Sequence, residues 1–292
     1  MDNLTAKVSC FARAYHYKNN KVHIFADDAA EKLLGDDYDL VAQSMSQGIS
    51  FFLPGFQGMP EEGLRLIVEK NLSPSVLGRS AYCECMLTNE KRLGCSQYVI
   101  FASGYDTFAI RNNDTSLSVF ELDLPEMFSD KQQRIEKAEL SSNATYVPCD
   151  LSDPEWKDKL IAVGFRPDRK SFASLLGISY YLTKDDFKSL LQALGSILCE
   201  GSDICFDYPT TEDSKESQTN QTLAAGAGEQ MKAQYSQDEM TKLLEESGFL
   251  IYEHLDHEEM TTQYFAQYNT ANPTHPMQAP KGVSYVLGVR KI

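Results

Sequence analysis

The sequence predicts an α/β fold in which helices wind around a mostly parallel sheet. Short apolar runs, rich in β-branched and aromatic residues, recur between residues 98 and 208, as buried parallel strands do. Amphipathic segments with apolar residues at spacings of three and four lie among and after them. Strands that alternate with helices are joined by right-handed crossovers, and the expected result is a doubly wound sheet.

The N-terminal third has helical patterns. Helix openings are expected at residues 27–35 and 60–72, where acids or a proline precede apolar residues. Pro60 suits the first helical position, and the acids after it suit the positive end of the helix dipole. Residues 1–95 are therefore expected to form a helical cap that precedes the sheet.

The sheet is expected to begin near residue 96. Its parallel strands are predicted at residues 98–103, 117–123, 145–150, 171–177 and 203–208. A helix is predicted after Thr183, and a second one from a capping box, Ser236 with Glu239, to Gly248. The apolar runs at 249–255 and 283–292 have no strong helical pattern between them, so an antiparallel strand is expected at the C-terminal edge.

A single domain is predicted for the whole chain of 292 residues, with the cap at 1–95 and the α/β core at 96–292. The polar segment 210–234 interrupts that core. Because it falls between two core elements, it is expected to be either a linker or a lid over a pocket.

Composition limits the partners. The chain has 42 acidic and 27 basic side chains, a net charge of −15, which argues against nucleic acids and anionic membranes. It shows no export signal and no apolar run long enough to cross a membrane. The seven scattered cysteines form no disulfide framework and are expected to be reduced, so the predicted location is the cytoplasm.

No metal site is expected. Cys83 and Cys85 are too close in sequence for the usual zinc-binding pair and have no second pair. His254 and His257 lie among acidic residues, and a solvated surface is the preferred interpretation for them.

Ligands of open α/β sheets bind at the carboxyl ends of the strands. The first strand ends in ASGYDT, residues 102–107. Ala102 and Thr107 stand where the dinucleotide fingerprint has glycines, which disfavours a nicotinamide-dependent oxidoreductase. Taken alone, Gly104 is more simply explained as an ordinary turn glycine.

Acidic residues end the next two strands. Asp123 follows Gly104 by 19 residues, close to the spacing at which an acid accepts hydrogen bonds from the ribose hydroxyls of an adenosine ligand. Asp150 with Leu151 offers one polar acceptor and one apolar face, which suits adenine. Each aspartate is alternatively the cap of the helix that follows it.

In this order, the stretches QYVIFASGYDTFAIR, FELDLP, PCDLSDPEW and LLGISYYL resemble the motifs of the leucine carboxyl methyltransferase-like family. The segments FARAYHY and FADDAAEKLL resemble its N-terminal region, and the resemblance covers about residues 9–249. It implies a class I methyltransferase with a Rossmann-like fold and S-adenosylmethionine (SAM) as cofactor. It also implies O-methylation of a carboxylate, or of a hydroxyl, of a small molecule or peptide.

The resemblance implies roles for single residues. Arg79 matches the arginine that pairs with the SAM carboxylate, which suits a guanidinium fork, and Asp106 and Thr107 match the family's Asp-Thr pair. Two positions depart from the pattern: Ala102 replaces the first glycine of the turn, and Leu176 replaces a glutamate that lines the cofactor pocket. The residues expected around the cofactor are Arg79, Ala102, Ser103, Gly104, Asp123, Leu124, Asp150, Leu151 and Leu176.

The acceptor site has weaker signals. Tyr180, Tyr181 and Tyr208 lie at or near strand ends and are candidates, although tyrosines there more often pack. A carboxylate acceptor is ionised at neutral pH and needs no base, whereas a hydroxyl needs one. No histidine lies near the motifs unless folding brings His16 or His23 over the pocket, and this favours a carboxylate.

A protein that binds SAM or a nucleotide without catalysis is the alternative function. Ala102 and Leu176 keep it open, because both change the expected cofactor pocket.

Overall fold

The structure is a computed structural model that describes residues 4–212 and 231–291. Most of the segment predicted as a linker or lid, residues 213–230, lies outside the described residues.

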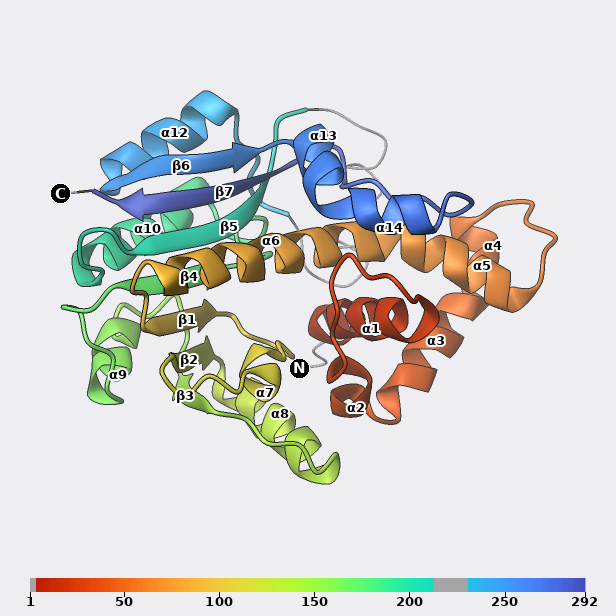
Figure 1. Cartoon of the computed structure of the whole chain (residues 1–292), viewed down its shortest axis with the longest axis horizontal. Coiled ribbons are helices and arrows are strands. Elements are labelled where there is room, and N and C mark those ends of the chain that lie inside the picture. The colour runs from red at the N-terminus through yellow and green to blue at the C-terminus, as the bar shows by residue number, and fades with distance from the viewer. Residues whose placement is uncertain (1–3, 213–230, 292) are drawn as a thin grey trace.

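A seven-stranded sheet forms the centre of the molecule, in the order β3-β2-β1-β4-β5-β7-β6 (Figure 1). Strands β1 to β5 are parallel, and β7 is antiparallel to both β5 and β6. The mostly parallel sheet with an antiparallel C-terminal part is thus confirmed, with β7 one place inside the edge strand β6. The strand bounds are Gln97–Phe101 (β1), Ser118–Asp123 (β2), Ala144–Pro148 (β3), Ser171–Leu175 (β4), Asp203–Pro209 (β5), Phe249–Leu255 (β6) and Val283–Arg290 (β7).

Helices precede, join and follow the strands. Before the sheet come α1 (Leu4–Asn19), α2 (Ala30–Leu34), α3 (Asp37–Gln47), α4 (Ile49–Phe52), α5 (Pro60–Ile67), the π-helical turn η1 (Val68–Leu72) and α6 (Ser73–Arg92). Within and after it come α7 (Phe108–Arg111), α8 (Pro125–Lys137), α9 (Trp156–Ala162), α10 (Lys184–Ile197), α12 (Gln237–Glu246), α13 (His257–Met260), η2 (Thr261–Phe265) and α14 (Ala266–Ala271).

Local capping explains where two of the predicted helices begin. The Thr183 side chain accepts a hydrogen bond from the Asp186 N–H at the start of α10. Ser236 and Glu239 form the predicted capping box of α12. Side-chain oxygens thus satisfy backbone N–H groups that have no partner inside the helix.

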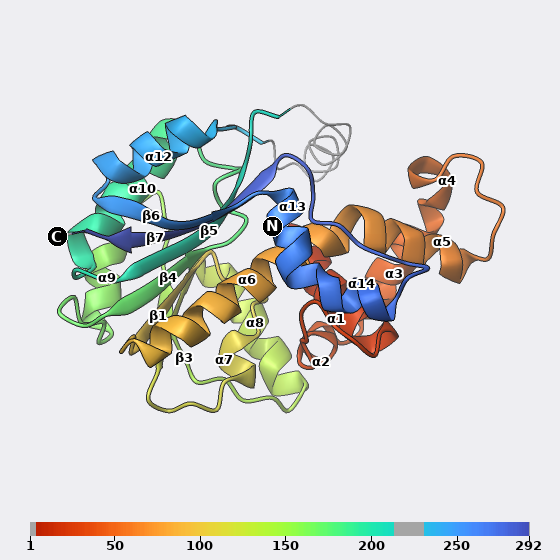
Figure 2. The ribbon, with the colours of Figure 1, turned by 45° about the horizontal axis from the view of Figure 1, so that its top comes forward.

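Helices cover both faces of the sheet (Figure 2). On one face, α9, α10 and α12 pack through apolar side chains such as Trp156, Leu191 and Met240 against alternate strand residues. On the other, α6, η2 and α14 pack against the intervening strand residues. This alternation of strand side chains between two apolar layers is what buried parallel strands require.

Helix α6 belongs to the sheet layers as much as to the N-terminal helices. Its side chains Leu77, Tyr82 and Leu87 are buried in the same apolar cluster as strand residues Tyr98 and Ile100. The expected division near residue 95 therefore falls after a helix that already covers the sheet.

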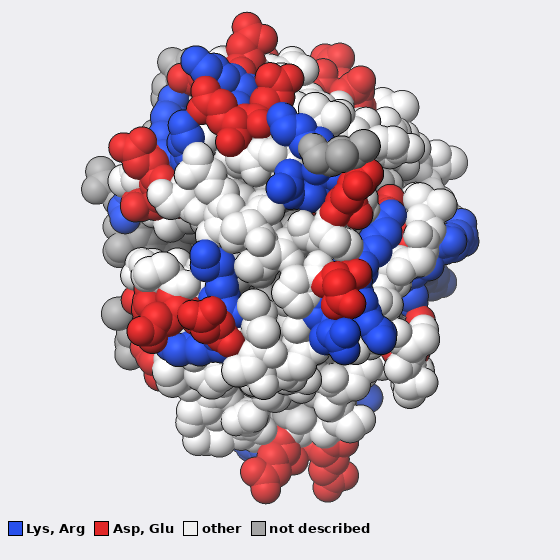
Figure 3. Space-filling model, turned by 90° about the vertical axis from the view of Figure 1, so that its left-hand side faces the viewer, with Lys and Arg blue, Asp and Glu red and all other residues white. Residues whose placement is uncertain are grey.

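No helix in the described part of the chain has the length and apolar character needed to cross a membrane. Figure 3 shows the side of the molecule where the parallel strands begin, and acidic and basic side chains are interspersed over it. That face offers no continuous basic surface for a polyanion.

Candidate active site

The turn after β1 is held by the end of β2. Gly104 has a φ of 49° and donates its backbone N–H to Asp123 Oδ2 at 2.7 Å. Ala102 in the same turn has a φ of 48°, a left-handed conformation that is costly for a residue with a Cβ. Ser103 between them is buried, and its N–H donates to the Leu122 carbonyl at 3.2 Å.

Asp123 does not cap the following helix. Its second oxygen, Oδ1, accepts from the N–H of Leu124 at 2.7 Å, and Leu124 is itself in the cap position of α8 without a side-chain cap. Burial raises the pKa of Asp123, and the two N–H donors oppose that shift. Because a carboxylate has about four lone-pair sites, Asp123 can still accept from ribose hydroxyls while it holds the turn.

Asp150 also does not cap its helix. Its Oδ1 accepts from the Ser152 N–H at 2.8 Å and from the Ser152 hydroxyl at 2.7 Å, which lowers the pKa of Asp150. Helix α9 starts after Glu155, without a side-chain cap. Asp150 is exposed and Leu151 packs partly against the core, so one polar and one apolar group follow β3.

The Asp-Thr pair after Gly104 ties the β1 turn to the N-terminal helices. The Thr107 hydroxyl donates to Asp27 Oδ2 at 2.8 Å, and Arg13 Nε donates to the same oxygen at 2.8 Å. Arg13 Nη2 also donates to the Tyr105 carbonyl at 2.6 Å. Sequence reasoning noted the segments that carry Arg13 and Asp27 but gave these residues no role. Arg13 lies in α1, and Asp27 lies in the loop that precedes α2.

Arg79 lies at the carboxyl ends of β4 and β5. A Cβ on Gly177, the second residue after β4, would come within 2.7 Å of Arg79 Nη1. The closest acid is Asp207 on β5, with Oδ2 3.7 Å from Nη1. The guanidinium makes no hydrogen bond to a residue within 4–212 or 231–291, so its fork of donors is available to a ligand.

Asp207 is a site residue that the sequence did not indicate. It is fully buried, and its carboxylate accepts from the Gly177 N–H at 2.7 Å and the Tyr180 hydroxyl at 2.9 Å. Its backbone carbonyl accepts from the Ser179 hydroxyl at 2.8 Å. Asp207 therefore fixes the loop that follows β4, which carries Leu176 and the candidate acceptor residues.

The three candidate acceptor tyrosines have different surroundings. Tyr180 is buried, and burial beside Asp207 raises the pKa of its hydroxyl well above the usual value. Tyr208 is fully buried, and its hydroxyl lies 2.8 Å from His254 Nε2. Tyr181 is half-buried. All three come from β5 or the loop after β4, and their role in acceptor binding stays a prediction.

Three of the five histidines, His16, His23 and His254, have partners within the fold. His16 is buried, and its Nε2 accepts from the Ile24 N–H at 3.0 Å. His23 is half-buried, and its Nε2 lies 3.1 Å from the Tyr17 carbonyl. His254 is half-buried, not solvated as expected, because it packs beside Tyr208. In the described part of the chain, no group of three or more His, Cys, Asp or Glu side chains is arranged to hold a metal ion.

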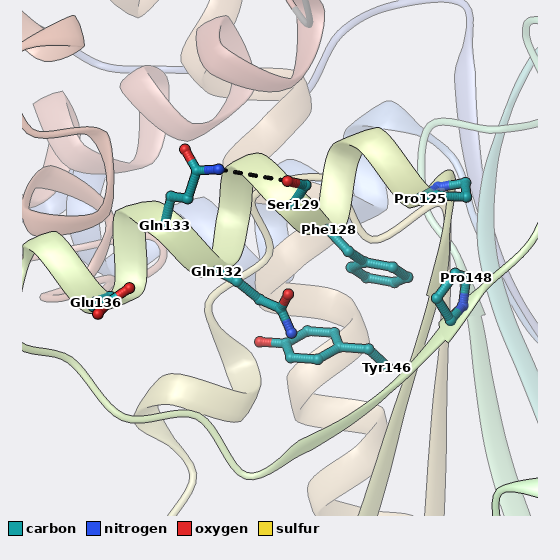
Figure 4. Close-up of a pocket in the computed structure, with 8 residues that line it drawn as sticks. All are labelled: Pro125, Phe128, Ser129, Gln132, Gln133, Glu136, Tyr146 and Pro148. Atoms are coloured by element: carbon teal, nitrogen blue, oxygen red, sulfur yellow. Dashed lines mark hydrogen bonds between the residues drawn. The ribbon is translucent and has the colours of Figure 1, made fainter.

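An open groove lies between α8 and the edge strand β3 (Figure 4). Apolar Phe128 and Tyr146 pack against each other along it, with ring centroids 4.8 Å apart. Its other lining residues are Pro125, Ser129, Gln132, Gln133, Glu136 and Pro148. The groove contains none of the residues expected around the cofactor.

The strand ends fit SAM. Asp123 retains acceptor capacity for the ribose, and Arg79 has free donors for the carboxylate of the methionine part. Gly104 and Gly177 bring backbone to the surface of the site without a Cβ. When bound there, SAM would supply an activated methyl group.

Known proteins match both the sequence and the fold. Residues 6–195 match the family described as leucine carboxyl methyltransferase. The Bacillus subtilis (strain 168) protein YktD, named as a "putative S-adenosyl-L-methionine-dependent methyltransferase", is 36% identical over 304 residues. The match covers 99% of this chain and 98% of YktD.

Two solved structures share the architecture. A "putative methyltransferase" from Thermobifida fusca aligns with a TM-score of 0.59 and 14% identity, over 98% of this chain and 94% of that one. Magnesium protoporphyrin IX methyltransferase from Synechocystis, solved with bound S-adenosylhomocysteine (SAH), aligns with a TM-score of 0.50 and 10% identity, over 91% and 100%. At these identities the likeness shows the fold.

The sheet and the helices that flank it form the fold of a class I methyltransferase. The chain belongs to the leucine carboxyl methyltransferase family, and as a member of it is a SAM-dependent methyltransferase.

Proposed function

We propose that the protein is an O-methyltransferase that methylates a carboxylate of a small molecule or peptide. The observation that supports the proposal is that the candidate bases near the strand ends already have hydrogen-bond partners, including His254, whose Nε2 lies 2.8 Å from the Tyr208 hydroxyl. His16 is buried and already accepts a backbone hydrogen bond, and the Tyr180 hydroxyl donates to Asp207. A carboxylate acceptor needs no base, because it is ionised at neutral pH.

Methyl transfer from a sulfonium to an oxygen is an in-line displacement that depends mainly on alignment. In this proposal Arg79 binds the carboxylate of the cofactor, Asp123 its ribose, and Asp150 with Leu151 its adenine. The backbone of the turn at Gly104 would contact the cofactor directly. Tyr180, Tyr181 and Tyr208 would shape the acceptor side, together with the N-terminal helices.

The chemistry of the product tests the acceptor class. The protein is incubated with methyl-labelled SAM and a panel of small carboxylic acids and peptides, and the product is then treated with mild alkali. We expect the label to be released as methanol, because carboxylate methyl esters hydrolyse in alkali. Label that survives alkali would exclude a carboxylate acceptor and overturn the proposal.

The alternative function, cofactor binding without catalysis, rests on Ala102 and Leu176. It predicts tight SAH binding by calorimetry with no transfer to any acceptor in the panel. Transfer to one acceptor above the rate without protein would exclude it.

We also propose a cytoplasmic location. All seven cysteines are free, and five of them are buried. Free cysteines are typical of a reducing compartment. Recovery of the protein in the membrane or secreted fraction of the cells that produce it would contradict this.

A further inference from the structure

A small cavity beside the β1 turn joins two residues that the cofactor motifs carry. Asp106, from the Asp-Thr pair, and Leu176, the first residue after β4, both line it. Arg13, Glu84 and Arg111 line the same cavity. Leu176 thus places an apolar side chain at a position where the family pattern has an acid, while an acid from the neighbouring strand end faces the same space.

The charges around this cavity do not balance. Arg13 is paired with Asp27, with Nε 2.8 Å from Oδ2. Arg111 forms a two-pronged pair with Glu84 and lies 3.5 Å from Asp27. Two arginines thus face three carboxylates. Asp106 is the one of the three that forms no ion pair within 4.0 Å, although Arg13 and Arg111 both lie near enough to attract it.

The Asp106 side chain has acceptor capacity to spare. Its Oδ1 accepts from the Phe108 N–H at 2.7 Å, and the residue is half-buried. No Lys, Arg or His side chain of residues 4–212 and 231–291 lies within 4.0 Å of its carboxylate. A ligand group that carries both a positive charge and N–H donors would pair with this carboxylate.

An arginine with unused hydrogen-bond donors, Arg79, lies beside the next residue of the β4 loop. The Arg79 guanidinium lies against Gly177, directly after Leu176, and makes no hydrogen bond to a described residue. Arg79, whose ion pair with Asp207 is a long one of 3.7 Å, lies beside Gly177, and Asp106 lines the same cavity as Leu176. An amino acid carries an ammonium and a carboxylate on one carbon, so its charges complement this arrangement.

We propose that Asp106 binds the α-ammonium group of the cofactor's methionine part, and so replaces the acid that is missing at Leu176. The proposal rests on the proposed function, because it assigns SAM to this site. The contribution of Asp106 to affinity should then depend on the ammonium group of the ligand.

Calorimetry with three ligands tests this. SAH carries the ammonium and the carboxylate, its deaminated analogue keeps only the carboxylate, and 5′-methylthioadenosine lacks both. We expect Asp106→Asn to weaken SAH binding by about 10- to 100-fold, because it removes a charge-assisted hydrogen bond. The affinities for the deaminated analogue and for 5′-methylthioadenosine should change by less than about threefold. The asparagine keeps an oxygen for the Phe108 N–H.

Two further variants complete the design. Adding Leu176→Glu to Asp106→Asn should restore the preference for SAH over the deaminated analogue, because it returns a carboxylate to the cavity. Asp168→Asn, at an exposed ion pair with Arg166, should leave all three affinities unchanged. The readout is the ratio of two affinities on the same sample, so partial unfolding of a variant does not change it.

The outcomes separate the two proposals. Wild-type affinity of Asp106→Asn for SAH, or an equal loss for SAH and its deaminated analogue, would overturn the role of Asp106 alone. If the unsubstituted protein bound neither SAH nor 5′-methylthioadenosine, the assignment of SAM to this site would fail, and the proposed function with it.

Discussion

Gly104 and Asp123 are joined by a hydrogen bond of 2.7 Å, from the backbone N–H of the β1 turn to the carboxylate that ends β2. Asp123 follows Gly104 by 19 residues, and the segment between them includes α7 and most of β2, whose parallel pairing with β1 brings the two strand ends side by side. The same carboxylate also accepts from its neighbour Leu124. Asp123 therefore shapes the turn and, with its remaining lone pairs, is available to a ribose.

Asp123→Asn should weaken the binding of SAH and of 5′-methylthioadenosine to a similar extent. An asparagine offers one oxygen and one NH₂ where two backbone N–H groups point, so one of them loses its acceptor and the ribose loses a charged acceptor. We expect about 10- to 100-fold weaker binding of both ligands by calorimetry. Unchanged affinity for 5′-methylthioadenosine would remove Asp123 from the ribose site.

Arg79→Ala should discriminate between those two ligands. It leaves the SAH carboxylate unpaired, so SAH binding should weaken by about 2–4 kcal/mol. The affinity for 5′-methylthioadenosine, which has no carboxylate, should be preserved. Arg166→Ala, at an exposed ion pair with Asp168, is the matched control and should affect neither ligand. An equal loss for both ligands after Arg79→Ala would indicate a structural role.

Ala102→Gly should stabilise the protein and strengthen SAH binding. Ala102 holds a left-handed conformation, with a φ of 48°, that glycine adopts without the Cβ clash. The gain is offset by the greater freedom of glycine in the unfolded chain, so we expect up to about 1 kcal/mol in urea unfolding. The binding gain follows because the methyl group stands where the turn meets the cofactor.

Glu139→Gly is the control for that prediction. Glu139, with a φ of 53°, is the other non-glycine residue with a positive φ among residues 4–212 and 231–291, and it is exposed after α8. Its replacement should stabilise the protein by a similar amount and leave SAH affinity unchanged. If both variants strengthened SAH binding equally, the effect of Ala102→Gly would be one of general stability.

Substitutions at the buried pair Glu121 and Lys131 should have strongly non-additive effects on stability. Lys131 Nζ lies 2.6 Å from Glu121 Oε2, and neither side chain is exposed. Lys131→Met leaves a buried acid alone and should cost about 3–5 kcal/mol in urea unfolding, whereas Glu121→Leu with Lys131→Met should recover most of that. Lys137→Met breaks an exposed pair with Asp36 and should cost less than about 1 kcal/mol. A double variant as unstable as the single one would contradict the coupling.

The positions of the strands and helices along the chain were predictable because strands and helices have different periodicities of apolar residues. Each predicted strand lies within two residues of the observed one. The hydrogen bond between Gly104 and Asp123 was not predicted, and the role of Asp123 at a ribose stays a prediction. The place of β7 inside β6 was not predictable, since it depends on pairing between strands distant in sequence. Asp207 was missed for a related reason: its partners Gly177 and Tyr180 are 30 and 27 residues away.

His16 should make the protein less stable in mild acid. Burial, aided by nearby His23, lowers the pKa of His16 to about 3. In the unfolded chain the pKa returns to about 6.5, so below that pH unfolding is coupled to uptake of a proton. The stability associated with neutral His16 is complete above pH 6.5 and is lost as the pH falls from 6.5 toward 3. The slope should approach about 1.4 kcal/mol per pH unit.

His16→Gln isolates this effect, because a glutamine oxygen can still accept from the Ile24 N–H but takes up no proton. We expect the free energy of unfolding, measured by urea at pH 7.5 and at pH 5, to fall by about 2 kcal/mol less in the variant than in the unsubstituted protein. Other buried titratable groups, such as Asp203, are present in both proteins, so their contribution cancels in the difference. An identical fall in His16→Gln would show that His16 already takes up its proton in the folded state.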